Sequence, residues 1–202
     1  MTQPASTSGL LPGFADPIGD SQQSFRGMLD AMARPGSVRR LSLPQAVPEG
    51  WVAAVTSLGL SLFDQDTPVW LDSAAATEEA CRFLRFHCGC PIVGEPGNGA
   101  FIVIANPAEM PPLHTYSAGD PLYPERSATV IVMVNSLSGG PPRSLSGPGI
   151  QDNAVIAPAG LPDGFSAQWA DNHTLYPSGV DVILAAGEEV LCLPRGVEMK
   201  EG

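Results

Sequence analysis

Proline and glycine punctuate this chain from one end to the other, and they separate most of the elements that it can form. The 202 residues include 21 prolines and 22 glycines, without a repeat of fixed period. No charge block or linker divides the chain, so its length predicts one domain, over residues 21–202. Residues 1–20 are rich in Ser, Pro, Thr and Gly and are predicted to be a flexible N-terminal segment.

Helical and strand patterns are mixed along the chain. Apolar Phe25, Met28, Leu29 and Met32 share one helical face, which predicts a helix capped by Asp20 or Ser21 and ended by residues 34–36. Further helices are predicted at 51–63, 77–87 and 165–173. Strands are predicted at 38–43, 69–71, 101–105, 129–134, around 145, at 155–156, and as a closing hairpin of 180–185 with 189–193. The mixture predicts an α/β fold with a mixed β-sheet flanked by helices.

The charge of the chain excludes several classes of partner. The net charge is −11, and the ten basic residues are nine arginines and a single lysine. We expect no nucleic-acid binding, because a basic stripe is missing, and no binding to anionic membranes for the same reason. No segment approaches the roughly 20 apolar residues of a membrane span. A local arginine pocket can still bind a small anion.

The four cysteines and the N-terminal sequence bear on the compartment. The first twenty residues lack a basic start followed by an apolar run, so no secretory signal is predicted. Cysteines without an export signal are typical of reduced thiols. The sequence therefore predicts a cytoplasmic protein.

Missing motifs narrow the chemistry further. The single lysine, Lys200, lies in a predicted tail, which excludes a P-loop and a pyridoxal-phosphate Schiff base. There is no Gly-x-Ser-x-Gly elbow and no His-Glu-x-x-His helix. Only His87, His114 and His173 are available, so a catalytic triad would require distant residues to meet.

One glycine-rich segment is a candidate anion site. Gly139, Gly140 and Gly147 surround Arg143 within residues 138–149. Such glycines let backbone amides approach a phosphate or phosphonate, and an arginine can pair with it in a bidentate manner. The alternative is a tight connection between strands that needs glycine for its dihedral angles.

The short run His87-Cys88-Gly89-Cys90, with Cys81 before it, contains soft ligands at close spacing. These residues could hold zinc, or they could be free thiols at the end of a helix near the core. A structural zinc site usually has a second pair of ligands, which this chain lacks, so no metal is predicted. His87 itself is either a buried, hydrogen-bonded histidine or a functional one.

Two charged residues stand out from their surroundings. Arg34 follows a predicted helix, whose C-terminal end favours a cation. Asp181 interrupts the apolar run of residues 180–184, so it is either paired with an arginine or a catalytic acid. The paired arrangement is the preferred hypothesis.

Taken together, six segments resemble one family, the H subunit (PhnH) of the carbon–phosphorus lyase system. Their order and spacing carry the resemblance over nearly the whole chain after Asp20. The segments are residues 25–36, 66–71, 84–87, 137–150, 176–181 and 193–195. In two respects this chain departs from the family pattern: a second arginine near Arg143 is missing, and Cys88 and Cys90 are not part of the pattern.

The resemblance implies a fold similar to that of the pyridoxal-phosphate-dependent transferases, without that cofactor. It also implies a homodimer when isolated, and partners in the G, I, J and K subunits of the same pathway. The family is assigned to the step that joins a phosphonate to the ribose of a nucleoside triphosphate and displaces the base. The iron–sulfur chemistry of the pathway belongs to another subunit.

Three hypotheses follow for this chain. The first is an assembly subunit that supports phosphonate transfer and is not catalytic alone. The second is a free-standing, anion-binding transferase or hydrolase, and the third is a structural adaptor without a ligand site. The candidate ligand-binding residues are Arg34, His87, Gly139, Gly140, Arg143, Gly147 and Asp181.

Overall fold

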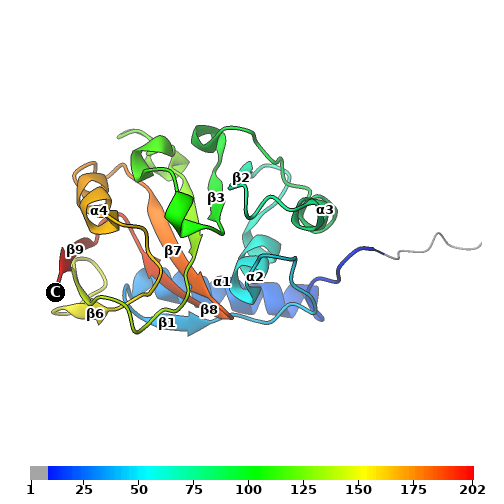
Figure 1. The fold of residues 1–202 in the computed structure, drawn as a ribbon, viewed down its shortest axis with the longest axis horizontal. Coiled ribbons are helices and arrows are strands. Elements are labelled where there is room, and N and C mark those ends of the chain that lie inside the picture. Colours follow the sequence, from blue (N-terminus) through cyan, green and yellow to red (C-terminus); the bar gives the residue numbers. More distant parts are fainter. Residues whose placement is uncertain (1–8) are drawn as a thin grey trace, which may run out of the picture.

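The computed structural model describes residues 9–202, which form an α/β domain around a six-stranded mixed sheet (Figure 1). The order of its strands is β1-β8-β7-β4-β3-β2. Their bounds are β1 Val38–Arg40, β2 Val69–Leu71, β3 Phe101–Ile104, β4 Thr129–Met133, β7 Asp181–Ala186 and β8 Glu189–Leu193. The predicted mixed sheet with flanking helices is confirmed.

The strands β2, β3, β4 and β7 are parallel to one another, with β2 at one edge of the sheet. Ile102 on β3 lies opposite Val130 on β4, and Ile131 lies opposite Ile183 on β7. These strands are apolar runs because both of their faces are covered. β8 returns antiparallel to β7 through a tight turn, and β1 adds an antiparallel edge.

Three helices cover one face of this sheet. They are α1 Pro17–Ala33, α2 Ala53–Leu62 and α3 Glu78–His87. Within α2, residues 54–59 are all buried, as its apolar sequence predicts. In α3, the Thr77 hydroxyl accepts a hydrogen bond from the Ala80 amide at 3.1 Å, which caps the helix where the sequence predicts its start.

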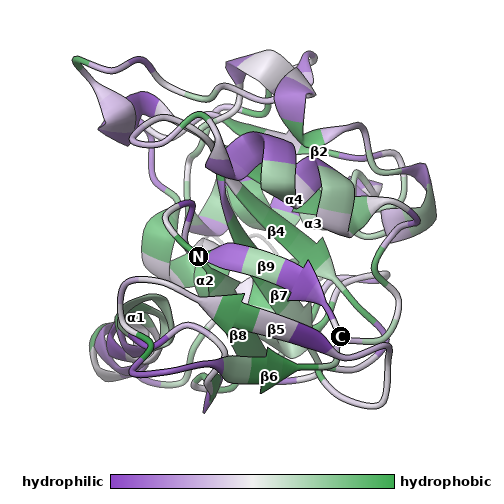
Figure 2. Ribbon diagram, turned by 90° about the vertical axis from the view of Figure 1, so that its left-hand side faces the viewer, coloured by the Kyte–Doolittle hydropathy of each residue, from purple (hydrophilic) through white to green (hydrophobic). Residues whose placement is uncertain are grey.

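The other face is covered by α4 Phe165–His173, by short 3₁₀ helices and by a second sheet in the order β6-β5-β9. Figure 2 shows this small sheet beside α4, with the larger sheet behind it. Trp169 of α4 is fully buried, and its indole N–H donates to the Val197 carbonyl at 2.8 Å. The bounds of the small strands are β5 Arg143–Ser146, β6 Ala154–Ile156 and β9 Glu198–Glu201. The short helices are Pro96–Asn98, Pro107–Glu109, Leu113–Thr115 and Pro124–Arg126.

The start of α1 differs from the prediction. Asp16 caps the helix, accepting a hydrogen bond from the Gly19 amide at 3.1 Å, so Asp20 and Ser21 lie inside the helix. Residues 17–20 of the predicted flexible segment are therefore helical, and residues 1–8 of that prediction lie outside the described part of the chain. A proline at the first helical position follows Asp16, a start signal that the prediction overlooked.

The buried face of α1 also differs from the predicted one. Met28 is buried as expected, together with Ser24 and Ala31. Phe25 and Leu29 are 42% and 47% exposed, so they lie on the solvent side of the helix. Glycine and small residues on the inner side explain the difference, because Gly27 lets α1 approach Leu41 closely.

The C-terminal end holds the strand that the prediction missed. Residues 198–201, predicted as a tail, pair antiparallel with β5 as strand β9, and Lys200 lies exposed on it. Only Met199 of this strand is buried, so its charged sequence gives little strand signal. No helix within residues 9–202 is long and apolar enough to cross a membrane.

Candidate functional site

The candidate residues do not come together into one site. Arg34 lies at the end of α1, His87 at the end of α3, Arg143 and Gly147 at opposite ends of β5, and Asp181 at the start of β7.

Arg34 is a solvent-exposed cation at the C-terminal end of α1. Its guanidinium pairs with Asp30, one helical turn earlier, and its side chain is 63% exposed. Asp30 also pairs with Arg39 of β1. The three side chains form a surface ion-pair cluster that joins α1 to β1.

His87 connects α3 to the segment before α1. Its Nε2 lies 2.9 Å from the Leu11 carbonyl oxygen, and its ring packs against Phe83 and Phe86. Gly13 is packed so closely on the imidazole that an added Cβ would lie 3.2 Å from it. These contacts support the hydrogen-bonded, structural interpretation of His87.

Asp181 is paired with an arginine, as the preferred hypothesis has it. Its Oδ1 accepts hydrogen bonds from the Arg195 amide at 2.8 Å and from Arg195 Nε at 3.1 Å, and Oδ2 meets Arg195 Nη2. The side chains are only 16% and 19% exposed. Arg195 Nη1 donates to the Pro124 carbonyl at 2.7 Å, so the ion pair joins β7, β8 and the loop before β4.

The cysteines are free thiols, two of them close together at the end of α3. The Cys88 thiol donates to the Gly59 carbonyl at 3.5 Å. The neighbouring Cys90 thiol, together with burial, raises the pKa of Cys88, and the neighbouring Cys88 thiol lowers the pKa of Cys90. Within the described residues, no three His, Cys, Asp or Glu side chains come together as metal ligands.

The three candidate glycines have packing roles that differ from one another. Gly140 donates its amide to the Ala157 carbonyl at 2.8 Å, and a Cβ there would lie 2.1 Å from the Pro158 carbonyl oxygen. Gly147 has a φ of +131° and lies against the Gly196 carbonyl. Gly139 faces open space at a φ of +83°. The glycines thus serve the loops around β5 and do not form a common cradle.

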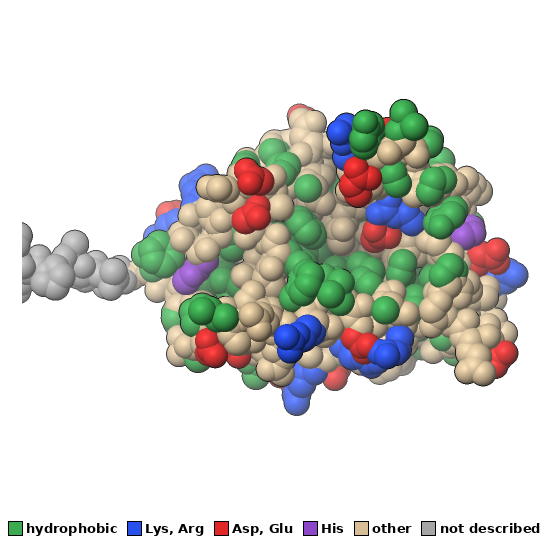
Figure 3. Space-filling model, turned by 180° about the vertical axis from the view of Figure 1, so that it is seen from behind, with side chains coloured by type: hydrophobic (Ala, Val, Ile, Leu, Met, Phe, Trp, Pro, Cys, Tyr) green, Lys and Arg blue, Asp and Glu red, His purple; other side chains and the backbone are tan. Residues whose placement is uncertain are grey.

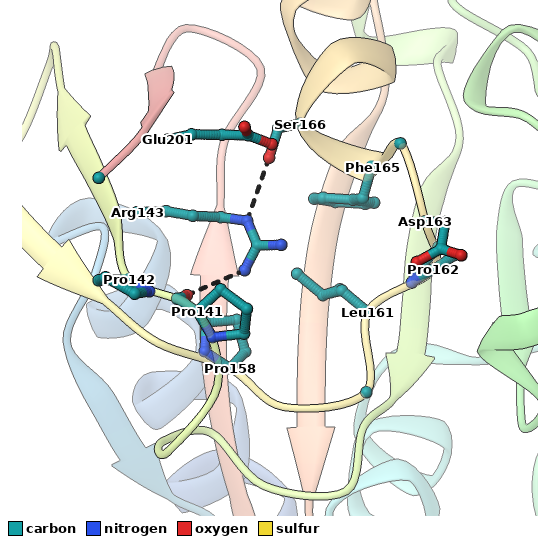
Figure 4. A pocket seen from close by; sticks show the side chains of 13 residues that line it. Pro141, Pro142, Arg143, Pro158, Leu161, Pro162, Asp163, Phe165, Ser166 and Glu201 are labelled. Carbon is teal, nitrogen blue, oxygen red and sulfur yellow. Dashed lines mark hydrogen bonds between the residues drawn. The ribbon is translucent and has the colours of Figure 1, made fainter.

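Arg143 lies in a cavity of about 340 Å³ between β5 and α4 (Figure 4). Its Nε donates to the Ser166 hydroxyl at 3.1 Å, and its Nη1 donates to the Pro141 carbonyl at 3.2 Å. These bonds hold the guanidinium so that it points into the gap between Leu161 and Phe165, as Figure 4 shows. The remaining N–H groups of the guanidinium can therefore meet a guest.

The surroundings of Arg143 set the size and charge of that guest. Ser166 is buried in the first turn of α4, which has Gly164 as its N-cap and therefore no side-chain cap; the Phe165 amide there donates to the Pro162 carbonyl at 3.2 Å. The helix dipole and the guanidinium both favour a negative charge here. Asp163 and Glu201 also line the cavity, and their carboxylates oppose a highly charged anion. A small anion with one or two charges fits this balance.

The sequence analysis missed two polar residues, Ser166 beside Arg143 and Asp72 at the end of β2. Ser166 lies in the first turn of a predicted helix, just after Gly164. A hydroxyl at this position can bind a ligand or cap the helix, and this was the available signal. Asp72 follows β2 and is 7% exposed, and its carboxylate accepts hydrogen bonds from the amides of Ala75, Ala105 and Asn106 at 2.7–3.0 Å. Asp72 ties the end of β2 to the end of β3.

Comparison with known proteins gives this α/β domain a family. The model of the bacterial phosphonate metabolism protein PhnH matches residues 12–200. A curated relative from Rhizobium meliloti (strain 1021), "Alpha-D-ribose 1-methylphosphonate 5-triphosphate synthase subunit PhnH", is 40% identical over 187 residues, 93% of this chain and 94% of its own. HtxG of Stutzerimonas stutzeri, named as a candidate C–P lyase subunit, is 42% identical over 72 residues, 36% of this chain and 37% of its own.

These matches identify a bacterial protein of phosphonate metabolism. The chain belongs to the PhnH family. The resemblance on which the sequence analysis relied is confirmed.

Proposed function

We propose that this chain is a subunit of the bacterial carbon–phosphorus lyase complex, where it supports the transfer of a phosphonate to the ribose of a nucleoside triphosphate. The observation that carries the proposal is the match over 93% of the chain to a relative whose name makes it a subunit of such a synthase. Arg34, His87 and Asp181 make structural contacts, which favours a supporting role over an independent catalytic one.

The proposal extends to the oligomeric state, the partner subunits and the fold similarity of this chain. We expect a homodimer when the chain is isolated, and the G, I, J and K subunits as partners in the cytoplasm. We also expect, from the family resemblance, a fold similar to that of the pyridoxal-phosphate-dependent transferases. The cofactor itself is not expected, since Lys200, the only lysine, is exposed on an edge strand.

The ligand in this proposal is a small phosphonate or phosphate, bound in the Arg143 cavity. The support is the guanidinium held by Ser166, the open first turn of α4 and the modest volume of the cavity. The two carboxylates that line the same cavity favour a single phosphonate group over a triphosphate.

Thermal unfolding tests the anion site. Methylphosphonate at ten times its dissociation constant should stabilise the protein by about 1.4 kcal/mol. That raises the Tm of a chain of this size by about 3–5 °C. Arg143→Ala should abolish the increase, whereas Arg34→Ala, which removes an exposed guanidinium elsewhere, should retain it. An equal increase in both variants would count against this site.

Co-purification tests the subunit role. Tagged protein from cells grown on methylphosphonate should retain the other carbon–phosphorus lyase subunits. Recovery of the tagged chain alone would contradict the proposal. Turnover of a nucleoside triphosphate and methylphosphonate by the purified chain would favour a free-standing transferase.

A further inference from the structure

A second cavity, of about 470 Å³, lies at the far end of β5 from Arg143. Its walls come from the last residue of α4, the loop after it, the turn after β5 and the start of β9. The lining residues are Ser146, Gly147, Pro148, His173, Tyr176, Gly196 and Glu198. Three of the segments that carry the family resemblance, residues 137–150, 176–181 and 193–195, reach this cavity or its immediate border.

An aromatic ring forms one wall. Tyr176 is 63% exposed, and its ring lies so close over Gly196 that an added Cβ would be 3.3 Å from it. Pro148 Cγ lies 3.9 Å from the same position. The ring is thus held in place by the floor of the cavity while much of its surface stays accessible to a guest.

Two polar side chains also line the cavity. His173 Nδ1 donates to the Arg195 carbonyl oxygen at 3.1 Å, which fixes the ring, and Nε2 lies 3.9 Å from Glu198 Oε1. The Glu198 carboxylate is 51% exposed and has only acceptor atoms.

A carboxylate beside an exposed aromatic ring suits a planar cation that has only donors. The guanidinium of arginine has five N–H donors and no acceptor, and it stacks on aromatic rings. The described part of the chain shows each half of this chemistry: the Arg126 guanidinium lies 4.0 Å from the centre of the Tyr123 ring, and Arg195 is paired with Asp181.

We propose that this cavity receives an arginine side chain from another subunit of the complex, with its guanidinium against Tyr176 and Glu198. This inference rests on the proposed function, because the arginine belongs to a partner chain. The net charge of −11 supports a partner that contributes the positive group. Figure 3 shows hydrophobic and charged side chains intermingled on this acidic protein, without an extended basic patch on the face in view.

One internal cation competes for the same carboxylate. Lys200 Nζ lies 3.6 Å from Glu198 Oε2, and the two side chains are 75% and 51% exposed. An exposed pair of this kind contributes little to stability, so an arriving guanidinium can displace it. His173, in contact with Glu198 Oε1, remains in place through its bond to Arg195.

The contact can be measured on the purified chain with arginine amide as the probe, followed by NMR of the His173 and Tyr176 rings. We expect saturable shifts with arginine amide and none with citrulline amide, its neutral isostere. Glu198→Gln should weaken binding about fivefold and Tyr176→Leu about threefold. Asp171→Asn, an exposed carboxylate outside this cavity, should leave binding unchanged. Absence of shifts, equal shifts with citrulline amide, or unchanged binding in the Glu198 and Tyr176 variants would overturn the inference.

Co-purification separates this inference from the proposed function. If the wild-type chain retains the other subunits and the double variant, Glu198→Gln with Tyr176→Leu, loses them, the inference stands. If both retain them equally, the inference fails and the subunit role remains. If the wild type retains none, the subunit role itself fails. Loss of self-association alone in the double variant would identify a second copy as the occupant and would overturn the assignment to a different subunit.

Discussion

Replacing Asp181 with asparagine tests whether this carboxylate is structural. Asparagine keeps the size of the side chain but removes the charge and turns one acceptor oxygen into an N–H donor that faces the Arg195 guanidinium. Asp181 accepts three hydrogen bonds from Arg195, and hydrogen bonds to charged groups contribute about 1.5–3 kcal/mol each.

The free energy of unfolding should therefore fall by about 2–4 kcal/mol. This range is near the lower end of what breaking a buried pair costs, because both side chains keep some exposure, 16% and 19%. For a chain of this size, the Tm should fall by about 5–15 °C. Urea unfolding followed by tryptophan fluorescence measures the change.

Two comparisons make the result decisive. Arg82→Met breaks an exposed pair with Glu78 at 4.0 Å and should change stability by less than about 0.5 kcal/mol. Arg195→Met should destabilise strongly, and the double variant should lose about 1–3 kcal/mol less than the sum of the single changes. A loss for Asp181→Asn no larger than that for Arg82→Met would refute the structural role of the pair.

Three further predictions follow from buried groups. Asp72→Asn should lower the free energy of unfolding by about 2–3 kcal/mol, because the N–H₂ group of asparagine would then face backbone amides. Urea unfolding measures the change, and an unchanged midpoint would contradict this prediction. Gly140→Ala should destabilise by more than about 2 kcal/mol, since its Cβ would lie 2.1 Å from a carbonyl oxygen, whereas Gly94→Ala, with open space around it, serves as the control. Burial, aided by Asp181, raises the pKa of Cys192 to about 12 from 9.0, so iodoacetamide at pH 8 should leave Cys192 unmodified in the native state. Below pH 9.0, the pKa of the unfolded thiol, the stabilising contribution of Cys192 is fully present, and it is lost as the pH rises toward the folded pKa of about 12. This contribution to the free energy of unfolding should therefore be smaller at pH 10.5 than at pH 8.

The elements with strong local patterns were predictable from the sequence. The apolar runs predicted β4 and β7, and the amphipathic face of residues 77–87 predicted α3. Strand β9 was not predictable, because its charged residues are held by pairing with β5 some fifty residues earlier in the chain. The start of α1 was misplaced because two acidic residues four positions apart, Asp16 and Asp20, both suit an N-cap.

For the candidate ligand-binding residues, the sequence predicted the types of side chain but not which of them would come into contact. An arginine partner for Asp181 followed from the cost of burying a charge, and the structure supplies Arg195. The contact of Arg143 with Ser166, 23 residues later, depends on how α4 packs beside β5. The sequence suggested a cradle of Gly139, Gly140 and Gly147, but the β5 strand separates these glycines into two loops. Pairing across strands, and not the local sequence, decides which candidates meet.

Reconstituted turnover tests the central claim most directly. The measurement is consumption of a nucleoside triphosphate with methylphosphonate by the other purified carbon–phosphorus lyase subunits, with and without this chain, and by this chain alone. The account predicts no turnover by the chain alone and recovery of turnover when it joins the other subunits. Turnover by the isolated chain, or full activity of the other subunits without it, would contradict the account.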